Sequence, residues 1–406
     1  MDKSIVPEIK RAVLDRIDPM KDTDEEELAS IIDGILAEYG MLYCISAGVK
    51  AEYRKLLFND IRKLDILQEL LEDDGITEIM VNSWDRIYYE RDGRIYRWDK
   101  SFESVERLKE IVQRIAALSN KIINESVPVA DTRLSDGSRV NVVMNPIAIE
   151  GPVITIRKFY DTPISIEKLI EMGSITEEAA DFLKKLVTAK YNIFVSGGTG
   201  SGKTTFLNAL SNFIPEDERV ITIEDSAELK LQKVQNLVRL EARSANIEGN
   251  NAVGIRDLIK TSLRMRPDRI IVGEVRGPEA IDMLQAMNSG HDGSMSTGHA
   301  NGDRDMMLRL ETMIMMGIDM PISAIRGQIA SAIDIVVHLG RLRDKSRRVL
   351  SISEVVGVCD GEVNLRRLFE FVEEWEDDEG KIQGELKRTG EIFCNTEKLR
   401  RAGFFV

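Results

Sequence analysis

The sequence predicts an α/β protein with two folded domains and a short helical segment in front of them. The chain has 406 residues, which exceeds one ordinary domain and suits two or three. Short β-like runs bounded by turn residues occupy the middle of the first half. From about residue 164, uniformly apolar runs of strand length alternate with helical stretches. This alternation is typical of a parallel sheet that helices cover on both faces.

Residues 1–58 are expected to form the helical segment. The runs IVPEIKRAVLDRI and EEELASIIDGILAEYG place apolar residues at i, i+3 and i+4, the spacing of an amphipathic helix.

Residues 59–160 are expected to form a smaller N-terminal α+β domain. Its β-like runs are EIMVN, RIYYERDGRIYRW, RVNVVMN and PVITIRKF, with one helical run, VERLKEIVQRIAAL, among them. Asp92-Gly93 and Asp136-Gly137 fall where hairpin turns are favoured. The stretch from Tyr160 to Pro163 is interpreted as a linker, because proline resists continuation of a strand.

Residues 161–406 are expected to form an α/β domain with a β-containing C-terminal extension. The strand-length runs are NIFVSG, RVITIE, RIIVGE, SMSTGH and DIVVHL, separated by helices such as TTFLNALSNFI and IRDLIKTSLRM. The acidic stretch EFVEEWEDDEG, residues 370–380, is interpreted as a solvated loop between strands.

Composition narrows the class of protein. No run approaches the roughly 18 apolar residues of a membrane span, and the first twenty residues carry charges throughout, so a soluble, cytoplasmic chain is expected. The net charge of −14 argues against non-specific contact with nucleic-acid phosphates. Three cysteines without a C-x-x-C pair indicate neither a disulfide framework nor a zinc site, and we expect mostly buried thiols.

A phosphate-binding loop is the strongest motif. Residues 197–204, GGTGSGKT, fit G-x-x-x-x-G-K-[ST] completely, follow an apolar run and open a helix, a context that a chance glycine-rich turn lacks. Backbone N–H groups of such a loop surround phosphate oxygens, the lysine reaches them, and the last hydroxyl can bind Mg²⁺. The predicted nucleotide-binding residues are Gly197, Gly198, Thr199, Gly200, Ser201, Gly202, Lys203, Thr204 and Thr205.

Acidic residues should complete the site at the ends of neighbouring strands. RVITIEDSAEL places Glu224, Asp225 and Glu228 after one strand, and RIIVGEVRG places Glu274 after another, so both segments should point into the nucleotide crevice. Helix capping is the alternative for Glu224 and Asp225. Thr204, Glu274 and Asp225 are the predicted Mg²⁺ ligands.

Two of the three histidines fall in the glycine-rich segment GHDGSMSTGHANG. His291 and His299 could contact a γ-phosphate there, although a lone histidine is usually structural. His338, within the run DIVVHL, is interpreted as an ordinary strand residue.

Four segments in order resemble the type II and type IV secretion ATPase superfamily, which includes the GspE-like and PilT-like motors. SGGTGSGKTT resembles its Walker A motif, TIEDSAEL its Asp box, MRPDRIIVGEVRG its Walker B region and STGHA its His box. RLEARSANIEGN, DTRLSDGSRVNVVMNP and the stretch around Walker B resemble the CpaF branch, which powers tight-adherence (Flp, type IVc) pilus assembly. The four-cysteine zinc module of type II relatives is missing.

The resemblance implies a RecA-like ATPase domain that uses ATP and Mg²⁺ within a homo-hexameric ring. It implies partners among inner-membrane platform proteins and a location on the inner face of the cytoplasmic membrane. Arginines of the N-terminal domain would approach the γ-phosphate, and the matching positions are Arg139 and Arg157, with Arg133 weaker. A surface charge pair is the alternative for them. Glu274 would take the Walker B role, and either Glu224 or Glu228 the Asp-box role.

The predicted function is therefore an ATP-hydrolysing motor driven by closure of the two domains. A nucleic-acid-stimulated P-loop translocase is the alternative, which the acidic charge disfavours. A scaffold that binds ATP without turnover is a third reading, which the intact set of candidate acids disfavours.

Overall fold

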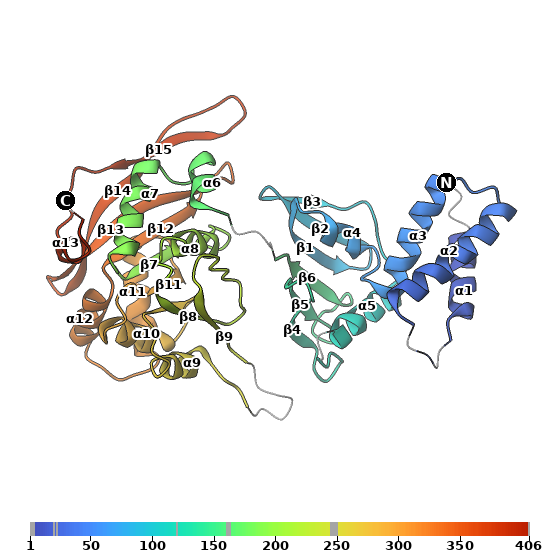
Figure 1. Cartoon of the computed structure of the whole chain (residues 1–406), viewed down its shortest axis with the longest axis horizontal. Helices are drawn as coiled ribbons and strands as arrows, with labels where there is room; N and C mark the ends of the chain where they lie inside the picture. Colours follow the sequence, from blue (N-terminus) through green and yellow to red (C-terminus); the bar gives the residue numbers. More distant parts are fainter. Residues whose placement is uncertain are drawn as a thin grey trace. The chain divides into compact units, whose positions relative to one another are not determined.

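The computed structural model of the chain describes residues 5–18, 21, 23–118, 121–159, 164–243 and 251–404 (Figure 1). The chain divides into two compact units, Met1–Asp161 and Thr162–Val406. The predicted linker from Tyr160 to Pro163 lies outside the described residues, as does part of the segment RLEARSANIEGN.

The first unit begins with helices α1 (Val6–Arg16), α2 (Glu25–Leu42) and α3 (Ala47–Arg62), which share a small apolar core. Asp24 caps α2 by accepting a hydrogen bond from the main-chain N–H of Glu27 at 2.8 Å. Because α3 continues to Arg62, residue 58 lies inside a helix and does not end the helical segment. Arg107 of the following part bonds the carboxylate of Asp60, which fastens α3 to the rest of the unit.

The rest of the first unit is a six-stranded antiparallel sheet with helices on its apolar face. Helices α4 (Leu67–Glu72) and α5 (Val105–Leu118) pack on the alternating buried residues of the strands, such as Val140 and Ile154. Asp92 and Gly93 both have positive φ in the hairpin that the sequence predicts there. The strands are β1 (Ile76–Ser83), β2 (Arg86–Arg91), β3 (Arg94–Arg97), β4 (Val129–Arg133), β5 (Arg139–Val143) and β6 (Val153–Arg157), in the order β3-β2-β1-β6-β5-β4.

The second unit contains a nine-stranded sheet whose order is β15-β14-β13-β12-β7-β11-β10-β8-β9. The strands from β12 to β9 in this order are parallel. Strands β13, β14 and β15 extend the sheet beyond β12, each antiparallel to its neighbour. Their bounds are β7 (Ile193–Gly197), β8 (Arg219–Glu224), β9 (Asn236–Glu241), β10 (Arg269–Val272), β11 (Met295–His299), β12 (Ile335–Arg341), β13 (Arg347–Cys359), β14 (Glu362–Glu376) and β15 (Ile382–Arg388).

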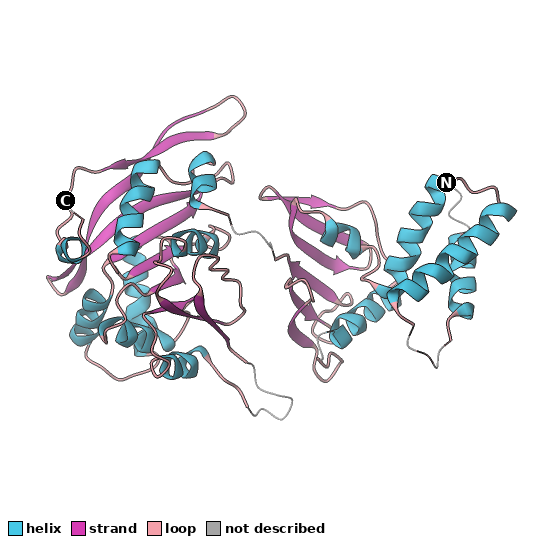
Figure 2. Ribbon diagram, viewed as in Figure 1, coloured by secondary structure: helices cyan, strands magenta, loops and turns pink. Residues whose placement is uncertain are grey.

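Helices cover both faces of the parallel strands, as the uniformly apolar runs predict (Figure 2). Helices α7 and α8 pack on one face, and α9 to α12 pack on the other. Among the described residues, no helix combines the length and the apolar character needed to cross a membrane. The bounds are α6 (Ile166–Glu171), α7 (Glu177–Thr188), α8 (Lys203–Ser211), α9 (Ile255–Ser262), α10 (Glu279–Asn288), α11 (Asp303–Met315), α12 (Ile322–Ala332) and α13 (Glu397–Arg401).

Two expectations about the surface are wrong. Most of the acidic stretch EFVEEWEDDEG is strand β14 and not a loop, because neighbouring cations compensate its charge. Arg343 donates to Glu373 at 2.7 Å and to Glu376 at 2.8 Å.

The three cysteines, Cys44, Cys359 and Cys394, are exposed and not buried, because they lie at the ends of elements or in a loop.

Candidate nucleotide-binding site

The phosphate loop lies between β7 and α8, at the carboxyl end of a central parallel strand. Gly202 precedes α8 with φ of 92°, in the left-handed region that glycine tolerates. A Cβ at Gly197 would lie 2.5 Å from the carbonyl oxygen of Leu339, so the neighbouring strand β12 leaves no room for a side chain. These glycines let the loop turn sharply beside β12 and leave its N–H groups near the start of a helix, an arrangement that favours anions.

Lys203 is held inside this loop with only 8% of its surface exposed. Its Nζ donates to the carbonyl oxygens of Gly197 at 3.1 Å and Gly198 at 2.9 Å. The same Nζ lies 3.3 Å from Nδ1 of His299. The ammonium is thus fixed between the loop and the end of β11.

Glu274 follows β10 and joins the same group of charges. Its Oε1 lies 2.8 Å from Nε2 of His299, and its Oε2 accepts a hydrogen bond from Nη2 of Arg276 at 2.7 Å. Burial and the nearby Lys203 lower the pKa of His299, which favours a neutral imidazole at pH 7. The hydrogen bond to Glu274 raises the pKa of Arg276. Arg276 was not among the predicted site residues, although its position two residues after Glu274 in GEVRG offered a signal.

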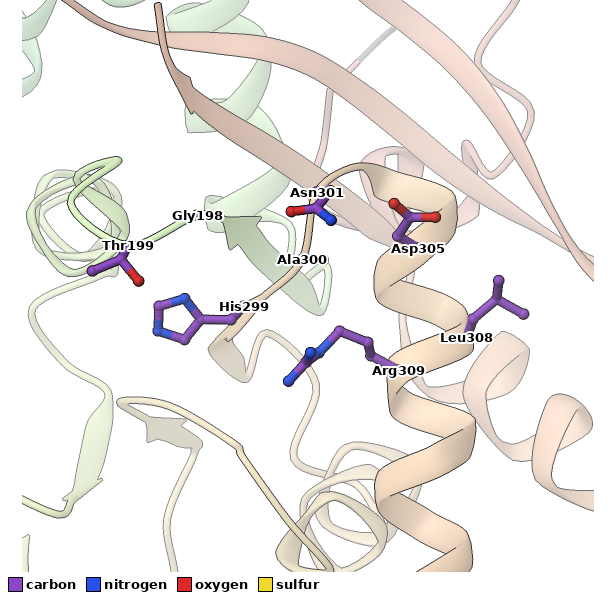
Figure 3. Close-up of a pocket in the computed structure, with 8 residues that line it drawn as sticks. All are labelled: Gly198, Thr199, His299, Ala300, Asn301, Asp305, Leu308 and Arg309. Carbon is purple, nitrogen blue, oxygen red and sulfur yellow. The ribbon is translucent and has the colours of Figure 1, made fainter. Parts of the chain in front are cut away.

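A pocket of about 450 Å³ opens beside this group (Figure 3). Figure 3 shows Thr199 of the phosphate loop and Arg309 of α11, with the ring of His299 between them in this view. The residues from α11 were not predicted, because their spacing in sequence gives no sign that the helix borders the loop. The lining residues are Gly198, Thr199, His299, Ala300, Asn301, Asp305, Leu308 and Arg309.

The acids after β8 differ from one another. Glu224 is 4% exposed, and its Oε2 accepts hydrogen bonds from the main-chain N–H groups of Glu228 at 2.8 Å and Leu229 at 2.9 Å. Burial raises the pKa of Glu224 to about 7. Asp225 is exposed. Glu224 therefore holds the loop that follows β8. It binds main-chain N–H groups, as the capping alternative implies, although no helix begins in this described segment.

The donor set suits Mg²⁺ at a nucleotide. Thr204 lies in the first turn of α8, and Glu274 follows β10 at the same edge of the sheet. In the part of the chain that the structure describes, no three acidic, histidine or cysteine side chains gather into a metal cage. Mg²⁺ does not need one, because it commonly binds one or two protein oxygens together with water and substrate phosphates. The predicted ligand Asp225 is exposed one residue beyond β8.

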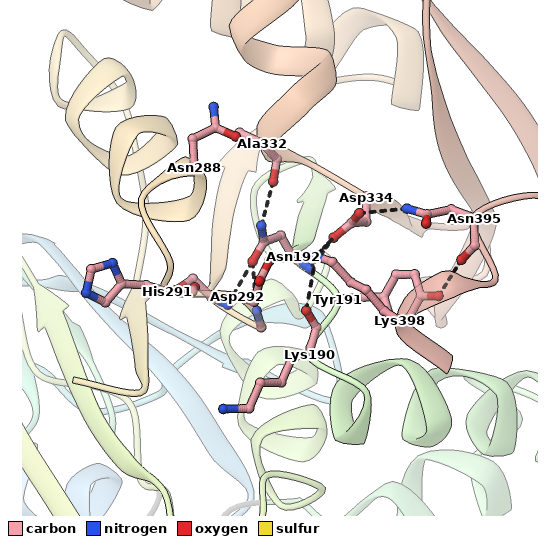
Figure 4. A network of polar contacts seen from close by, with 12 residues as sticks. Lys190, Tyr191, Asn192, Asn288, His291, Asp292, Ala332, Asp334, Asn395 and Lys398 are labelled. Atoms are coloured by element: carbon pink, nitrogen blue, oxygen red, sulfur yellow. Dashed lines mark hydrogen bonds and ion pairs between the residues drawn. The ribbon is translucent and has the colours of Figure 1, made fainter. Parts of the chain in front are cut away.

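The histidines occupy three different places. His299 belongs to the site, whereas His291 precedes β11 at its opposite end, with Nδ1 3.2 Å from the carbonyl oxygen of Ala286 (Figure 4). The hypothesis that both histidines contact a phosphate is therefore wrong for His291. His338 is a buried strand residue, as predicted, and its Nδ1 lies 2.9 Å from Oγ of Ser196.

The three candidate arginines lie on neighbouring strands of the first unit. Arg133 of β4 pairs with Arg139 of β5, which in turn pairs with Arg157 of β6. Arg157 faces Glu78 of β1 on its other side. Opposite charges directly across a ladder are favourable, so Glu78 is a suitable neighbour for Arg157 in the sheet.

Comparison with known proteins places the chain in a family. The family model described as "Type II/IV secretion system protein" matches residues 60–384. A putative conjugal transfer protein of Mycobacterium tuberculosis is 33% identical over 315 residues, which cover 76% of this chain and 89% of the relative. The type IV secretion system protein PtlH of Bordetella pertussis is also 33% identical over 315 residues, with 71% and 93% covered.

A solved structure agrees with the fold. The ATPase DotB of Legionella pneumophila matches with a TM-score of 0.51 and 21% identity, over 70% of this chain and 78% of DotB. The second unit has a RecA-like P-loop ATPase fold, and a separate N-terminal unit precedes it. From the matched family model and the two relatives, we conclude that the chain belongs to the type II/IV secretion system protein family.

Proposed function

We propose that this protein is a motor that hydrolyses ATP to drive a membrane-embedded machine of the type IV pilus or secretion kind. The observation that carries the proposal is the contact series Lys203–His299–Glu274, in which Glu274 follows β10 and His299 ends β11 beside the phosphate loop. The contacts support the proposal because an ammonium suited to phosphate oxygens and a carboxylate suited to act on water touch the same imidazole.

Each side chain of the series has a separate task. Lys203 binds the β- and γ-phosphate oxygens in exchange for the loop carbonyls that it now contacts. Glu274 orients the attacking water, because Arg276 fixes one of its oxygens and leaves the other toward His299. Neutral His299 hydrogen-bonds without adding charge. Thr204 and Glu274 would hold Mg²⁺, which would neutralise part of the phosphate charge when bound.

The row of arginines provides the transition-state charge in this proposal. Arg139 and Arg157, neighbours across β5 and β6, would be brought to the γ-phosphate when the two domains close. We expect Arg139→Ala and Arg157→Ala to reduce turnover by about 10³-fold with little change in ATP affinity. Arg97→Ala, an exposed arginine on β3 of the same sheet, is the matched control. Steady-state phosphate release measures the effect, and equal activity of all three variants would contradict it.

The finer assignment is a homo-hexamer of the CpaF type, which acts on inner-membrane platform proteins of a Flp/Tad pilus from the cytoplasmic side. The quoted CpaF-like segments support this branch. Relatives named as type IV secretion and conjugal transfer proteins support a role in a secretion machine.

Activity measured against protein concentration tests the proposal. We expect Mg²⁺-dependent ATPase activity to rise as hexamers form, with mass recorded in parallel. Activity of a monomer that does not depend on concentration would contradict the ring. Stimulation by single- or double-stranded nucleic acid would favour the translocase instead.

A further inference from the structure

A buried polar cluster lies beneath the nucleotide pocket, on the face of the sheet that α11 covers. Such a group is unusual inside an otherwise apolar core, because buried polar atoms cost free energy unless they are hydrogen-bonded. Its members come from β7, β12, β13, β14 and the start of α11. We call it the polar cluster. It comprises the buried residues Ser196, His338, Ser351, Ser353 and Asp303, with the exposed Arg367 at its edge.

One half of the polar cluster holds the phosphate loop. Ser196 is fully buried and directly precedes Gly197, the first residue of the loop. The hydroxyl of Ser196 lies 2.9 Å from Nδ1 of His338. The imidazole also hydrogen-bonds the main chain of Asn301, which lines the pocket opposite the loop. The ring thus touches the strand that enters the loop and the segment that follows His299.

The other half holds the start of α11. Asp303 is the first residue of this helix, two residues before the pocket residue Asp305. Its Oδ2 accepts hydrogen bonds from Oγ of Ser353 at 2.6 Å and from Oγ of Ser351 at 3.4 Å. Arg367 lies 3.3 Å from the same carboxylate. A carboxylate at this position also suits the positive end of the helix.

The two halves are joined through the β12–β13 ladder, in which His338 and Ser351 are direct neighbours. One wall of the pocket, Gly198 and Thr199, follows Ser196 in the chain. The other wall, from His299 to Asp305, is tied to His338 and Asp303. The polar cluster therefore connects both walls through side-chain hydrogen bonds and the pairing of β12 with β13.

We propose that His338 and Asp303 are positioning residues that set the spacing between the phosphate loop and the His299–Asn301 wall, and so favour a nucleoside triphosphate over a diphosphate. The inference rests on the proposed function, because it takes the pocket as the place of the γ-phosphate. If one wall shifts, its contacts to a γ-phosphate between the walls weaken. The contacts that the phosphate loop alone makes to a diphosphate remain.

A pair of buried serines tests the proposal. Ser196→Ala removes the hydrogen bond to His338, whereas Ser296→Ala, on the same face of the neighbouring strand β11, removes a hydroxyl that has no hydrogen-bond partner among the described residues. Both serines are fully buried, so their cavities are matched. Ser353→Ala loosens the α11 side independently if Ser196→Ala does not fold.

The measurement is calorimetric binding of ADP and of a non-hydrolysable ATP analogue to the full chain. We expect Ser196→Ala and Ser353→Ala to weaken binding of the analogue about fivefold, the effect of one buried hydrogen bond, and to leave ADP binding within about twofold. Ser296→Ala should change neither. An equal loss for both nucleotides, or the same loss in Ser296→Ala, would overturn the inference alone. A wild-type chain that binds neither nucleotide would overturn the proposed function as well.

Discussion

The two ends of the parallel sheet in the second unit are built differently. At the carboxyl ends of β7, β10 and β11, Lys203, His299 and Glu274 crowd together around a glycine-rich loop. At the amino ends of β7 and β12, uncharged and charged groups form a closed hydrogen-bond network around Asn192 and Asp334 (Figure 4). At the carboxyl end, charged side chains lie together beside a pocket. At the amino end, each charged side chain is hydrogen-bonded to partners within the fold.

The amino end satisfies its polar groups through side chain to main chain bonds. Oδ1 of Asn192 accepts from the N–H groups of Gly293 at 2.9 Å and Ser294 at 3.0 Å, and its Nδ2 donates to Ala332 O at 2.8 Å. Asp334 accepts from Asn192 N–H and from Lys398 of α13, each at 2.8 Å. The comparison indicates that residues at the amino end of the sheet stabilise the fold, whereas residues at the carboxyl end carry the chemistry.

The largest expected effect is loss of activity at the carboxyl end. Lys203→Ala removes the cation nearest the phosphate position, and we expect turnover to fall by about 10²-fold or more with the fold retained. Phosphate release at saturating ATP measures the loss, and the melting temperature serves as the control. Wild-type turnover in this variant would contradict the claim that residues at the carboxyl end carry the chemistry.

The amino end should show the opposite behaviour. Asn192→Ala leaves two buried main-chain N–H groups and one carbonyl without their partner, so we expect the free energy of unfolding to fall by about 3 kcal/mol. Below the melting transition, turnover per folded molecule should stay near the wild-type value. Urea denaturation measures the free energy of unfolding, and phosphate release measures turnover. A stable but inactive variant would contradict the claim that the amino end serves stability.

Glu224, at the carboxyl end of β8, should make the free energy of unfolding depend on pH, an effect smaller than the two above. Its folded-state pKa of about 7 lies above the ordinary value of 4.5, so the folded state binds a proton more tightly than the unfolded state. Its contribution to the free energy of unfolding is therefore full below about pH 4.5 and decreases as pH rises to about 7. Glu224→Gln, which keeps an acceptor for Glu228 and Leu229, should remove this part of the pH dependence. Parallel stability curves for both proteins across this range would contradict the assignment.

The sequence predicts the α/β class and the position of the phosphate loop because both depend on local patterns. Apolar runs fix the parallel strands, and the order strand, glycine loop, helix fixes residues 197–204. Strand β9 was not predicted, because Asn236, Arg239 and Glu241 interrupt its apolar residues, unlike the uniformly apolar strands. Arg309 was not predicted either, since only the tertiary fold brings α11 to the loop.

The acidic strand β14 shows a second limit. In the sequence, its run of glutamates is typical of a solvated loop. The fold brings Arg343 and Lys387 beside these glutamates, which a local pattern does not reveal. Pairings between residues distant in sequence, such as Ser196 with His338, have no local signature either.

The central claim is that Glu274 acts on water while Lys203 binds the nucleotide. Glu274→Gln preserves the size of the side chain and a hydrogen-bonding oxygen but removes the charge, so the variant separates binding from turnover. We predict that it binds ATP without Mg²⁺ as tightly as wild type within about threefold, whereas turnover with Mg²⁺ falls by about 10²-fold or more. A variant that binds ATP and still hydrolyses it at the wild-type rate would contradict the account.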